Sequence, residues 1–99
     1  MRAWTIRSAR PEEAAALAVL DSLNWPAPLE CLKEHEIRTR IALYPEGQLV
    51  AVADGMIMGS LYTQRIQTVD VVKRSTFRDA IKLHEADGPI LQLLTVQTR

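Results

Sequence analysis

Two groups of side chains in this sequence could take part in chemistry, and the first surrounds a histidine near the end of the chain. His84 is followed by Glu85 and, two residues later, by Asp87. A histidine beside carboxylates is suited to proton transfer near neutral pH, so His84 is a candidate general base. The alternative is an exposed polar turn before Gly88, which we favour. The sequence therefore leaves the catalytic residues unknown.

The second group is Cys31 and His35, which lie four residues apart. Both residue types bind zinc, but a zinc site needs three or four ligands, and no further cysteine or histidine lies nearby. We therefore predict no metal site. Since Cys31 is the only cysteine, no intramolecular disulfide can form, and a reducing, cytoplasmic setting fits best.

The charge balance argues against several classes of partner. The chain has twelve basic and twelve acidic residues and no basic cluster, so we predict no nucleic-acid partner. No apolar run approaches the ~20 residues of a membrane span, and the polar start MRAWTIRSAR does not resemble a secretory signal, so we predict no membrane partner. Ninety-nine residues predict one small domain.

The first half of the chain predicts a strand and two helices. In residues 3–9, Trp4 and Ile6 alternate with Thr5 and Arg7, as in a half-buried strand. A helix is predicted over 11–23, since proline suits its first position and strong helix formers follow. After NWPAP, a second helix is predicted over 29–44, with the ion pairs Glu34–Arg38 and Glu36–Arg40 on its solvent face and Pro45 ending it.

The second half begins with a hairpin. Two alternating apolar runs, residues 47–53 and 56–66, flank Asp54-Gly55, which suits the positive φ angles of a two-residue turn. Gly59 inside the second run predicts a bulge or a close backbone approach. Residues 67–87 predict an irregular insert with a short helix in VDVVKR. Gly88-Pro89 then opens a last strand, ILQLLTV.

This order of elements resembles the N-terminal half of the GNAT acyltransferase superfamily. The resemblance covers nearly the whole chain and rests on TIRSARPEEAAAL, on PEGQLVA before the Asp-Gly hairpin, and on IMGS after it. Within the superfamily, WPAPL, GSLYTQRI, STFRDAIKLHEADGP and LQLLTV are most similar to the GNAT-like domains of polyketide synthase loading modules. The implied fold class is α+β: a mainly antiparallel four-stranded sheet with two N-terminal helices, in the order β-α-α-β-β-insert-β.

The resemblance also implies where ligands bind. The strand that ILQLLTV resembles lies along the pantetheine arm of CoA, which implies backbone contacts from Leu94, Thr95 and Val96. Trp25 and Tyr62, with Phe77 as a weaker candidate, are implied to line an acyl pocket. In each case the alternative is an ordinary packed residue. The family implies acetyl-CoA or malonyl-CoA as acyl donor, and no cofactor is expected to be required for folding.

In GNAT proteins this last strand leads into a glycine-rich loop that binds the pyrophosphate. The four glycines here, at 47, 55, 59 and 88, never form a Gly-x-Gly spacing. We therefore expect residues 1–99 to be the N-terminal part of a single GNAT-like domain whose C-terminal half is absent, and to be inactive alone. The intact family implies an acyltransferase with a short acyl donor, or a malonyl-CoA decarboxylase and S-acyltransferase that acts with an acyl carrier protein.

A different class of function stays open, a non-enzymatic module that associates with itself. The strand ILQLLTV is apolar, contains no proline and has no charge before Arg99. Exposed strand edges of this kind pair readily with another chain. We therefore predict a homo-oligomer through the edge of the C-terminal strand.

Overall fold

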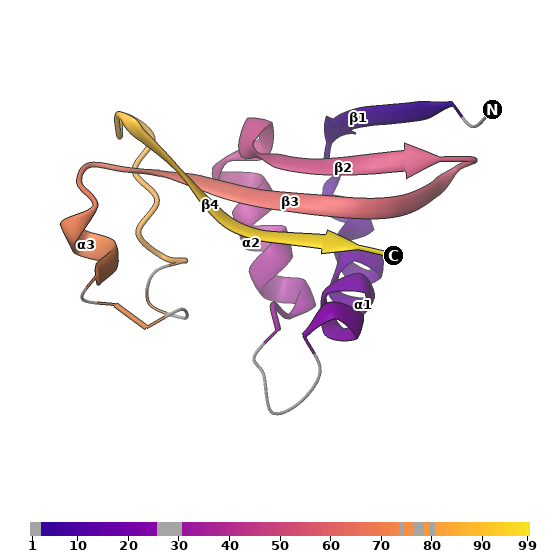
Figure 1. Cartoon of the computed structure of the whole chain (residues 1–99), viewed down its shortest axis with the longest axis horizontal. Coiled ribbons are helices and arrows are strands. Elements are labelled where there is room, and N and C mark those ends of the chain that lie inside the picture. Colours follow the sequence, from indigo (N-terminus) through magenta and orange to yellow (C-terminus); the bar gives the residue numbers. More distant parts are fainter. Residues whose placement is uncertain (1–2, 26–30, 74, 77–78, 80) are drawn as a thin grey trace.

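The protein consists of one antiparallel sheet with two helices packed on one of its faces (Figure 1). The structure, a computed structural model, describes residues 3–25, 31–73, 75–76, 79 and 81–99. The strands pair in the order β1-β2-β3-β4, which confirms the predicted α+β class. The elements are β1 (Trp4–Ser8), α1 (Ala14–Asn24), α2 (Glu34–Leu43), β2 (Gln48–Ala53), β3 (Met56–Ile66), α3 (Asp70–Lys73) and β4 (Ile90–Thr98), with short 3-10 turns at Pro11–Glu13 and Pro45–Gly47.

The first helix starts where the sequence predicts. Pro11 opens a 3-10 turn that continues into α1, and the Glu13 carboxylate accepts the backbone N–H of Arg10 at 2.8 Å. Both carboxylate oxygens of Glu13 also bind the Arg7 guanidinium, at 2.9 and 2.7 Å. These bonds to Arg7 lower the pKa of Glu13 and join β1 to the start of α1.

The second helix is shorter than predicted. It begins at Glu34, not at residue 29, because Lys33 is extended and its N–H donates to the Glu36 carboxylate at 3.0 Å, as in an N-cap. Residues 29 and 30 lie outside the described residues. The Glu34–Arg38 pair is confirmed at 3.7 Å.

The prediction that Arg40 lies on the solvent face is wrong. Arg40 is buried and donates to the backbone carbonyls of Thr63, at 3.3 Å, and Ile81. Burial lowers the pKa of Arg40 to about 10. Arg40 therefore ties α2 to β3 and to the segment before β4.

The structure confirms the predicted hairpin, both its turn at Asp54-Gly55 and the special role of Gly59. Asp54 and Gly55 have φ angles of 54° and 72°. Ala51 pairs with Gly59 but Val52 pairs with Ile57, so Met58 is an extra residue and forms a bulge. A Cβ on Gly59 would lie 3.0 Å from the Gln97 carbonyl oxygen, so both predicted roles of this glycine are present.

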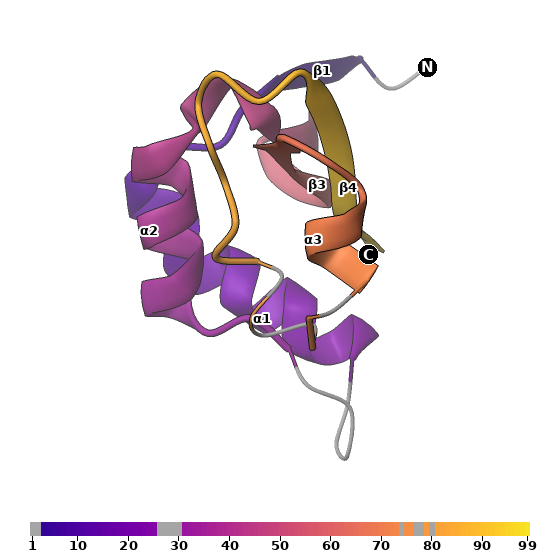
Figure 2. The ribbon, with the colours of Figure 1, turned by 90° about the vertical axis from the view of Figure 1, so that its left-hand side faces the viewer.

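The insert packs against both α2 and β3. It contains α3, which confirms the short helix predicted in VDVVKR. Residues 81–89 run beside α2 before the chain enters β4 (Figure 2), and the ring of His84 stacks on Tyr44 with centroids 4.6 Å apart. No helix in the described part of the chain is both long and apolar enough to span a membrane.

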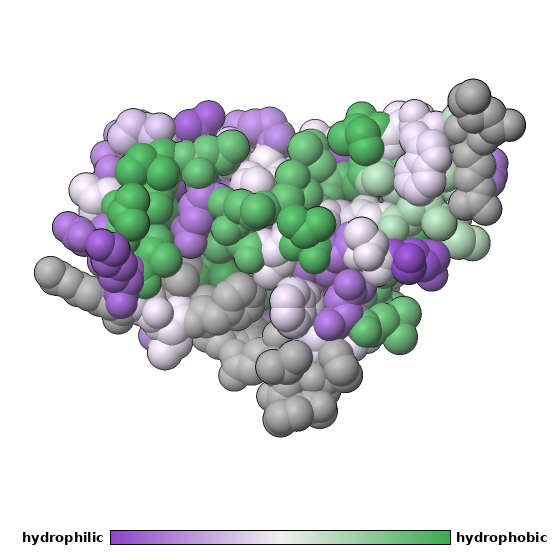
Figure 3. All heavy atoms as spheres, in the orientation of Figure 1, coloured by the Kyte–Doolittle hydropathy of each residue, from purple (hydrophilic) through white to green (hydrophobic). Residues whose placement is uncertain are grey.

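The opposite face of the sheet is open and apolar. The core lies between the helices and the sheet and is built around Leu17, Ile37, Ile41, Val50 and Tyr62. Trp4 and Ile6 lie away from this core and are 55% and 65% exposed, so the prediction of a half-buried first strand is wrong. Figure 3 shows hydrophobic residues gathered over the sheet on this face.

Candidate functional site

The last strand contains a bulge at the positions predicted to contact a cofactor. Tyr62 on β3 pairs with Thr95, but the next residue, Thr63, pairs with Leu93. Leu94 is therefore an extra residue in β4, and its side chain packs against the core. Bulges bend a strand and re-aim its side chains, and they are over-represented at sheet edges and next to active sites.

The outer edge of β4 carries backbone groups that do not pair within the described sheet, in which β4 has β3 as its one neighbour. Arg99 donates its N–H to Met58 on β3, at 2.9 Å, so the backbone groups of Thr98 point the other way. The Asn24 side chain at the end of α1 binds these groups, by donating to the Thr98 carbonyl at 3.0 Å and accepting its N–H at 3.4 Å.

The backbone of Val96 points toward the same edge as that of Thr98, because backbone groups alternate along an antiparallel strand. Thr98 is capped by Asn24, whereas Val96 is two residues closer to the bulge. The N–H and carbonyl of Val96 are thus placed to bind an extended ligand along the edge.

Polar side chains form cross-strand pairs between β3 and β4 on the face that the helices cover. The Ser60 hydroxyl donates to Gln97 Oε1 at 2.8 Å, and Gln64 Nε2 donates to Gln92 Oε1 at 2.7 Å. Between these pairs, Tyr62 lies opposite Thr95. Tyr62 is fully buried, and burial raises its pKa to about 12, with a smaller opposing effect from Ser60. Its hydroxyl therefore stays protonated at neutral pH.

The predicted pocket residues lie close to the predicted cofactor residues in the fold. Tyr62 and Thr95 are direct neighbours across β3 and β4. Trp25 is 36% exposed and directly follows Asn24, which contacts the end of β4. Phe77 lies outside the described residues.

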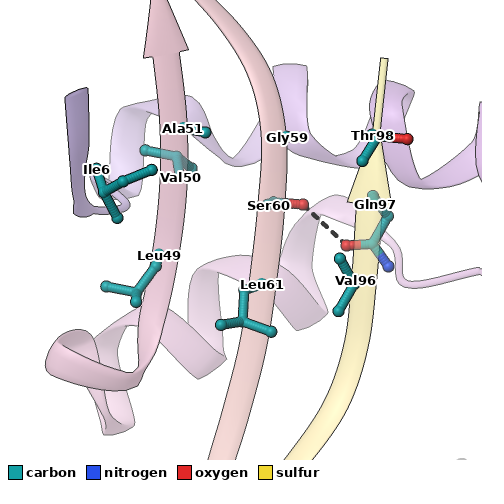
Figure 4. A pocket seen from close by; sticks show the side chains of 10 residues that line it. All are labelled: Ile6, Leu49, Val50, Ala51, Gly59, Ser60, Leu61, Val96, Gln97 and Thr98. Carbon is teal, nitrogen blue, oxygen red and sulfur yellow. Dashed lines mark hydrogen bonds between the residues drawn. The ribbon is translucent and has the colours of Figure 1, made fainter. Parts of the chain in front are cut away.

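A shallow apolar hollow lies over the same strands on the open face of the sheet (Figure 4). Its volume is about 240 Å³, and the side chains of Ile6, Leu49, Leu61 and Val96 line it. Sequence reasoning missed this hollow, since it forms only when four strands pair in the observed register. Val96 is therefore shared between the strand edge and the hollow.

The structure changes the interpretation of His84. It is half-buried, not an exposed turn residue, and its Nδ1 accepts the Arg65 backbone N–H at 3.0 Å. Burial and the nearby positive charge of Arg40 lower the pKa of His84. Because the acceptor nitrogen is occupied, His84 is suited to holding the insert on β3 and not to removing a proton from a substrate.

Cys31 and His35 do not share a helix. Cys31 precedes α2, whereas His35 lies within it and is exposed. Among the described residues no three histidine, cysteine or acidic side chains are grouped so that they could hold a metal ion.

Comparison with known proteins identifies the fold. No family model and no curated protein matches the chain, but solved structures do. The loading GNATL domain of CurA from Lyngbya majuscula superposes with a TM-score of 0.89 and 29% identity, over 97% of this chain and 48% of that one. The GphF GNAT-like decarboxylase in complex with isobutyryl-CoA superposes with a TM-score of 0.86 and 34% identity, over 95% and 48%.

The chain therefore has a GNAT-like fold over nearly all of its length. More narrowly, it is similar to GNAT-like proteins of polyketide loading and decarboxylation, as the sequence resemblance indicates. It spans about half the length of these two structures.

Proposed function

We propose that this chain forms the acyl-CoA-contacting part of a GNAT-like acyltransferase, with the backbone of Leu94, Thr95 and Val96 along the pantetheine arm. The observation that supports this best is the outward-pointing backbone of Val96, close to the bulge at Leu94. Val96 also directly follows Thr95, which pairs with Tyr62. Pantetheine carries two amide groups, which can pair with a strand edge as an added strand does. That GphF binds isobutyryl-CoA supports an acyl-CoA ligand.

The proposed reaction of the complete domain moves a short acyl group from CoA to an amine or a thiol, such as that of an acyl carrier protein. A malonyl donor would first release its carboxylate as CO2 and take up a proton at the carbon left behind, which gives an acetyl thioester. Acetyl-CoA and malonyl-CoA are the proposed donors, and Trp25 and Tyr62 the proposed pocket residues. Residues 1–99 form one part of a single domain and are inactive alone, because no glycine-rich cradle is present in them for the pyrophosphate. The lone Cys31 supports a cytoplasmic setting.

The test compares two substitutions at Val96 in a titration with isobutyryl-CoA. Val96→Pro removes the N–H that points away from β3, which a strand edge tolerates, whereas Val96→Ala keeps the N–H and shortens the side chain. We expect the unaltered chain to bind with a dissociation constant of about 1 mM. Val96→Pro should weaken binding at least about fivefold, the effect of one lost hydrogen bond.

Val96→Ala is the matched control and should bind within about twofold of the unaltered chain. Equal binding by the proline and alanine variants would show that the backbone of Val96 does not contact the ligand. A low-micromolar dissociation constant would also contradict the proposal, because it would require an anchor for the phosphates.

The second candidate function is self-association through β4. The observation that favours it is the exposure of Leu91, Leu93 and Val96, at 55%, 57% and 53%, beside the outer edge of that strand. Pairing of two β4 edges would satisfy the backbone groups of both copies and cover these side chains. The two candidates compete for the same edge, so acyl-CoA at saturating concentration should dissociate a dimer that forms there.

A further inference from the structure

Three polar atoms near the β4 bulge are buried without a hydrogen-bond partner of good geometry among the described residues. They are the Tyr62 hydroxyl, Thr95 Oγ1 and Gln97 Nε2. Such atoms are rare in folded proteins, since each one loses its bonds to water and gains none in return. Three of them on two neighbouring strands indicate a site that another group completes.

Two of these atoms belong to side chains that lie next to Ser60. Its hydroxyl donates to Gln97 Oε1 at 2.8 Å, so the amide nitrogen of Gln97 lies next to this bond and points elsewhere. Ser60 also lies close enough to the Tyr62 hydroxyl to lower the pKa of Tyr62, although the hydroxyl makes no well-formed hydrogen bond. Tyr62 and Gln97 are therefore both neighbours of Ser60, and the Tyr62 hydroxyl and Gln97 Nε2 are both excluded from solvent.

We infer that Tyr62 and Gln97 form a donor pair that binds the thioester carbonyl oxygen of the acyl group, with the Thr95 hydroxyl beside it. This inference rests on the proposed function, because the pantetheine along Val96 brings the thioester to this end of β4. A carbonyl oxygen has two lone pairs and can accept both donors. Two donors aimed at one oxygen also stabilise the negative charge that builds on it during acyl transfer.

The charges around the pair favour a neutral acceptor over a free carboxylate. Asp21 on α1 is fully buried, and its carboxylate accepts the Leu32 N–H, which places a negative charge under the sheet. Arg40 on α2 supplies a positive charge. Beside the larger effect of burial, Asp21 raises the pKa of Tyr62 and Arg40 lowers it. Because the charges of Asp21 and Arg40 offset each other, a neutral carbonyl oxygen can bind without an added ion. The carboxylate of a charged ligand would be repelled by Asp21.

The experiment compares two ligands that differ at the carbonyl. Isobutyryl-CoA has a thioester, whereas S-isobutyl-CoA is the matching thioether without the carbonyl oxygen. Dissociation constants for both are measured by NMR titration on the 99-residue chain, on Tyr62→Phe and on the control Tyr44→Phe. Tyr44 is a suitable control because it is also buried and its ring stacks on His84.

We expect the unaltered chain and Tyr44→Phe to prefer the thioester by roughly fivefold, and Tyr62→Phe to lose most of that preference. The infrared stretching band of a carbon-13 labelled thioester carbonyl should move to lower frequency on binding, and this shift should be smaller in Tyr62→Phe. Gln97→Met gives a second test of the pair and should reduce the same shift.

The outcomes separate this inference from the proposed function. If isobutyryl-CoA binds but Tyr62→Phe keeps the full thioester preference and the full infrared shift, the donor pair is wrong and the proposed function stands. If neither ligand perturbs the unaltered chain at 10 mM, about ten times the expected dissociation constant, both are wrong. A crystal structure with a water molecule on Tyr62 and Gln97, and the carbonyl elsewhere, would also overturn the inference.

Discussion

Replacing Gly88 by alanine should loosen the start of β4 and destabilise the protein strongly. A Cβ at this position would lie 2.7 Å from three backbone atoms of Ile66, its N, C and O. Ordinary contacts begin at 3.4 Å, so the two segments must separate by about 0.7 Å (3.4 − 2.7). Backbone cannot rotate away as a side chain can, which places the effect at the upper end of the ~1–3 kcal/mol typical of overpacking.

The expected loss in the free energy of unfolding is therefore about 2–3 kcal/mol. For a domain of this size, 1 kcal/mol corresponds to roughly 4–8 °C in Tm, so the expected decrease is about 10–20 °C. The assay is thermal and urea unfolding followed by circular dichroism. Because Gly88 lies two residues before the start of β4, the variant should also bind isobutyryl-CoA more weakly.

Gly55→Ala is the matched control for this prediction. A Cβ added to Gly55 would meet nothing within 4 Å, but the φ of 72° at this residue disfavours alanine by about 1–2 kcal/mol. Gly88→Ala should therefore be the more destabilising of the two. If Gly88→Ala unfolds at or above the Tm of Gly55→Ala, the close approach of residue 88 to Ile66 is refuted.

Three further predictions concern pH, association and activity. The free energy of unfolding should fall as the pH drops below about 6.5, the ordinary pKa of histidine. Burial holds the pKa of His84 below that value in the folded chain, so the unfolded chain binds the proton first. Urea unfolding of His84→Gln should therefore depend less on pH in this range. Sedimentation should give a mass above the 11.1 kDa monomer, and Leu93→Lys should reduce association; a monomer at low micromolar concentration excludes the β4 contact. The chain alone should show no acyl transfer and no malonyl-CoA decarboxylation, and turnover above background would disprove the inactive-fragment interpretation.

The parts of the fold that local signals encode were predictable from the sequence. The Asp54-Gly55 turn, the role of Gly59 and the start of the first helix at Pro11 each depend on residues next to one another in the chain. The order of elements follows from these signals, and together with the motifs TIRSARPEEAAAL, PEGQLVA and IMGS it carries the resemblance to GNAT-like domains.

The features that the sequence did not predict depend on distant contacts. Arg40 is buried because Thr63 and Ile81 accept its hydrogen bonds, and neither is near it in the sequence. Trp4 and Ile6 alternate as in a half-buried strand, but the helices cover the other face of the sheet.

The resemblance supplied the residues of the candidate site but not their geometry, and their role in binding stays a prediction. The resemblance selected Leu94, Thr95, Val96 and Tyr62, and the sheet register brings them together. The bulge at Leu94 and the cap that Asn24 provides at Thr98 become visible only once β3 and β4 are paired.

The most direct test of the acyl-CoA proposal is the response of the β4 backbone amides to ligand. Uniformly nitrogen-15 labelled chain is titrated with isobutyryl-CoA while its amide resonances are recorded. We predict that the amides of Val96 and Leu94 shift most and that those of β1, at the opposite edge of the sheet, stay unchanged. An unchanged Val96 amide at 10 mM ligand, about ten times the expected dissociation constant, would contradict the account.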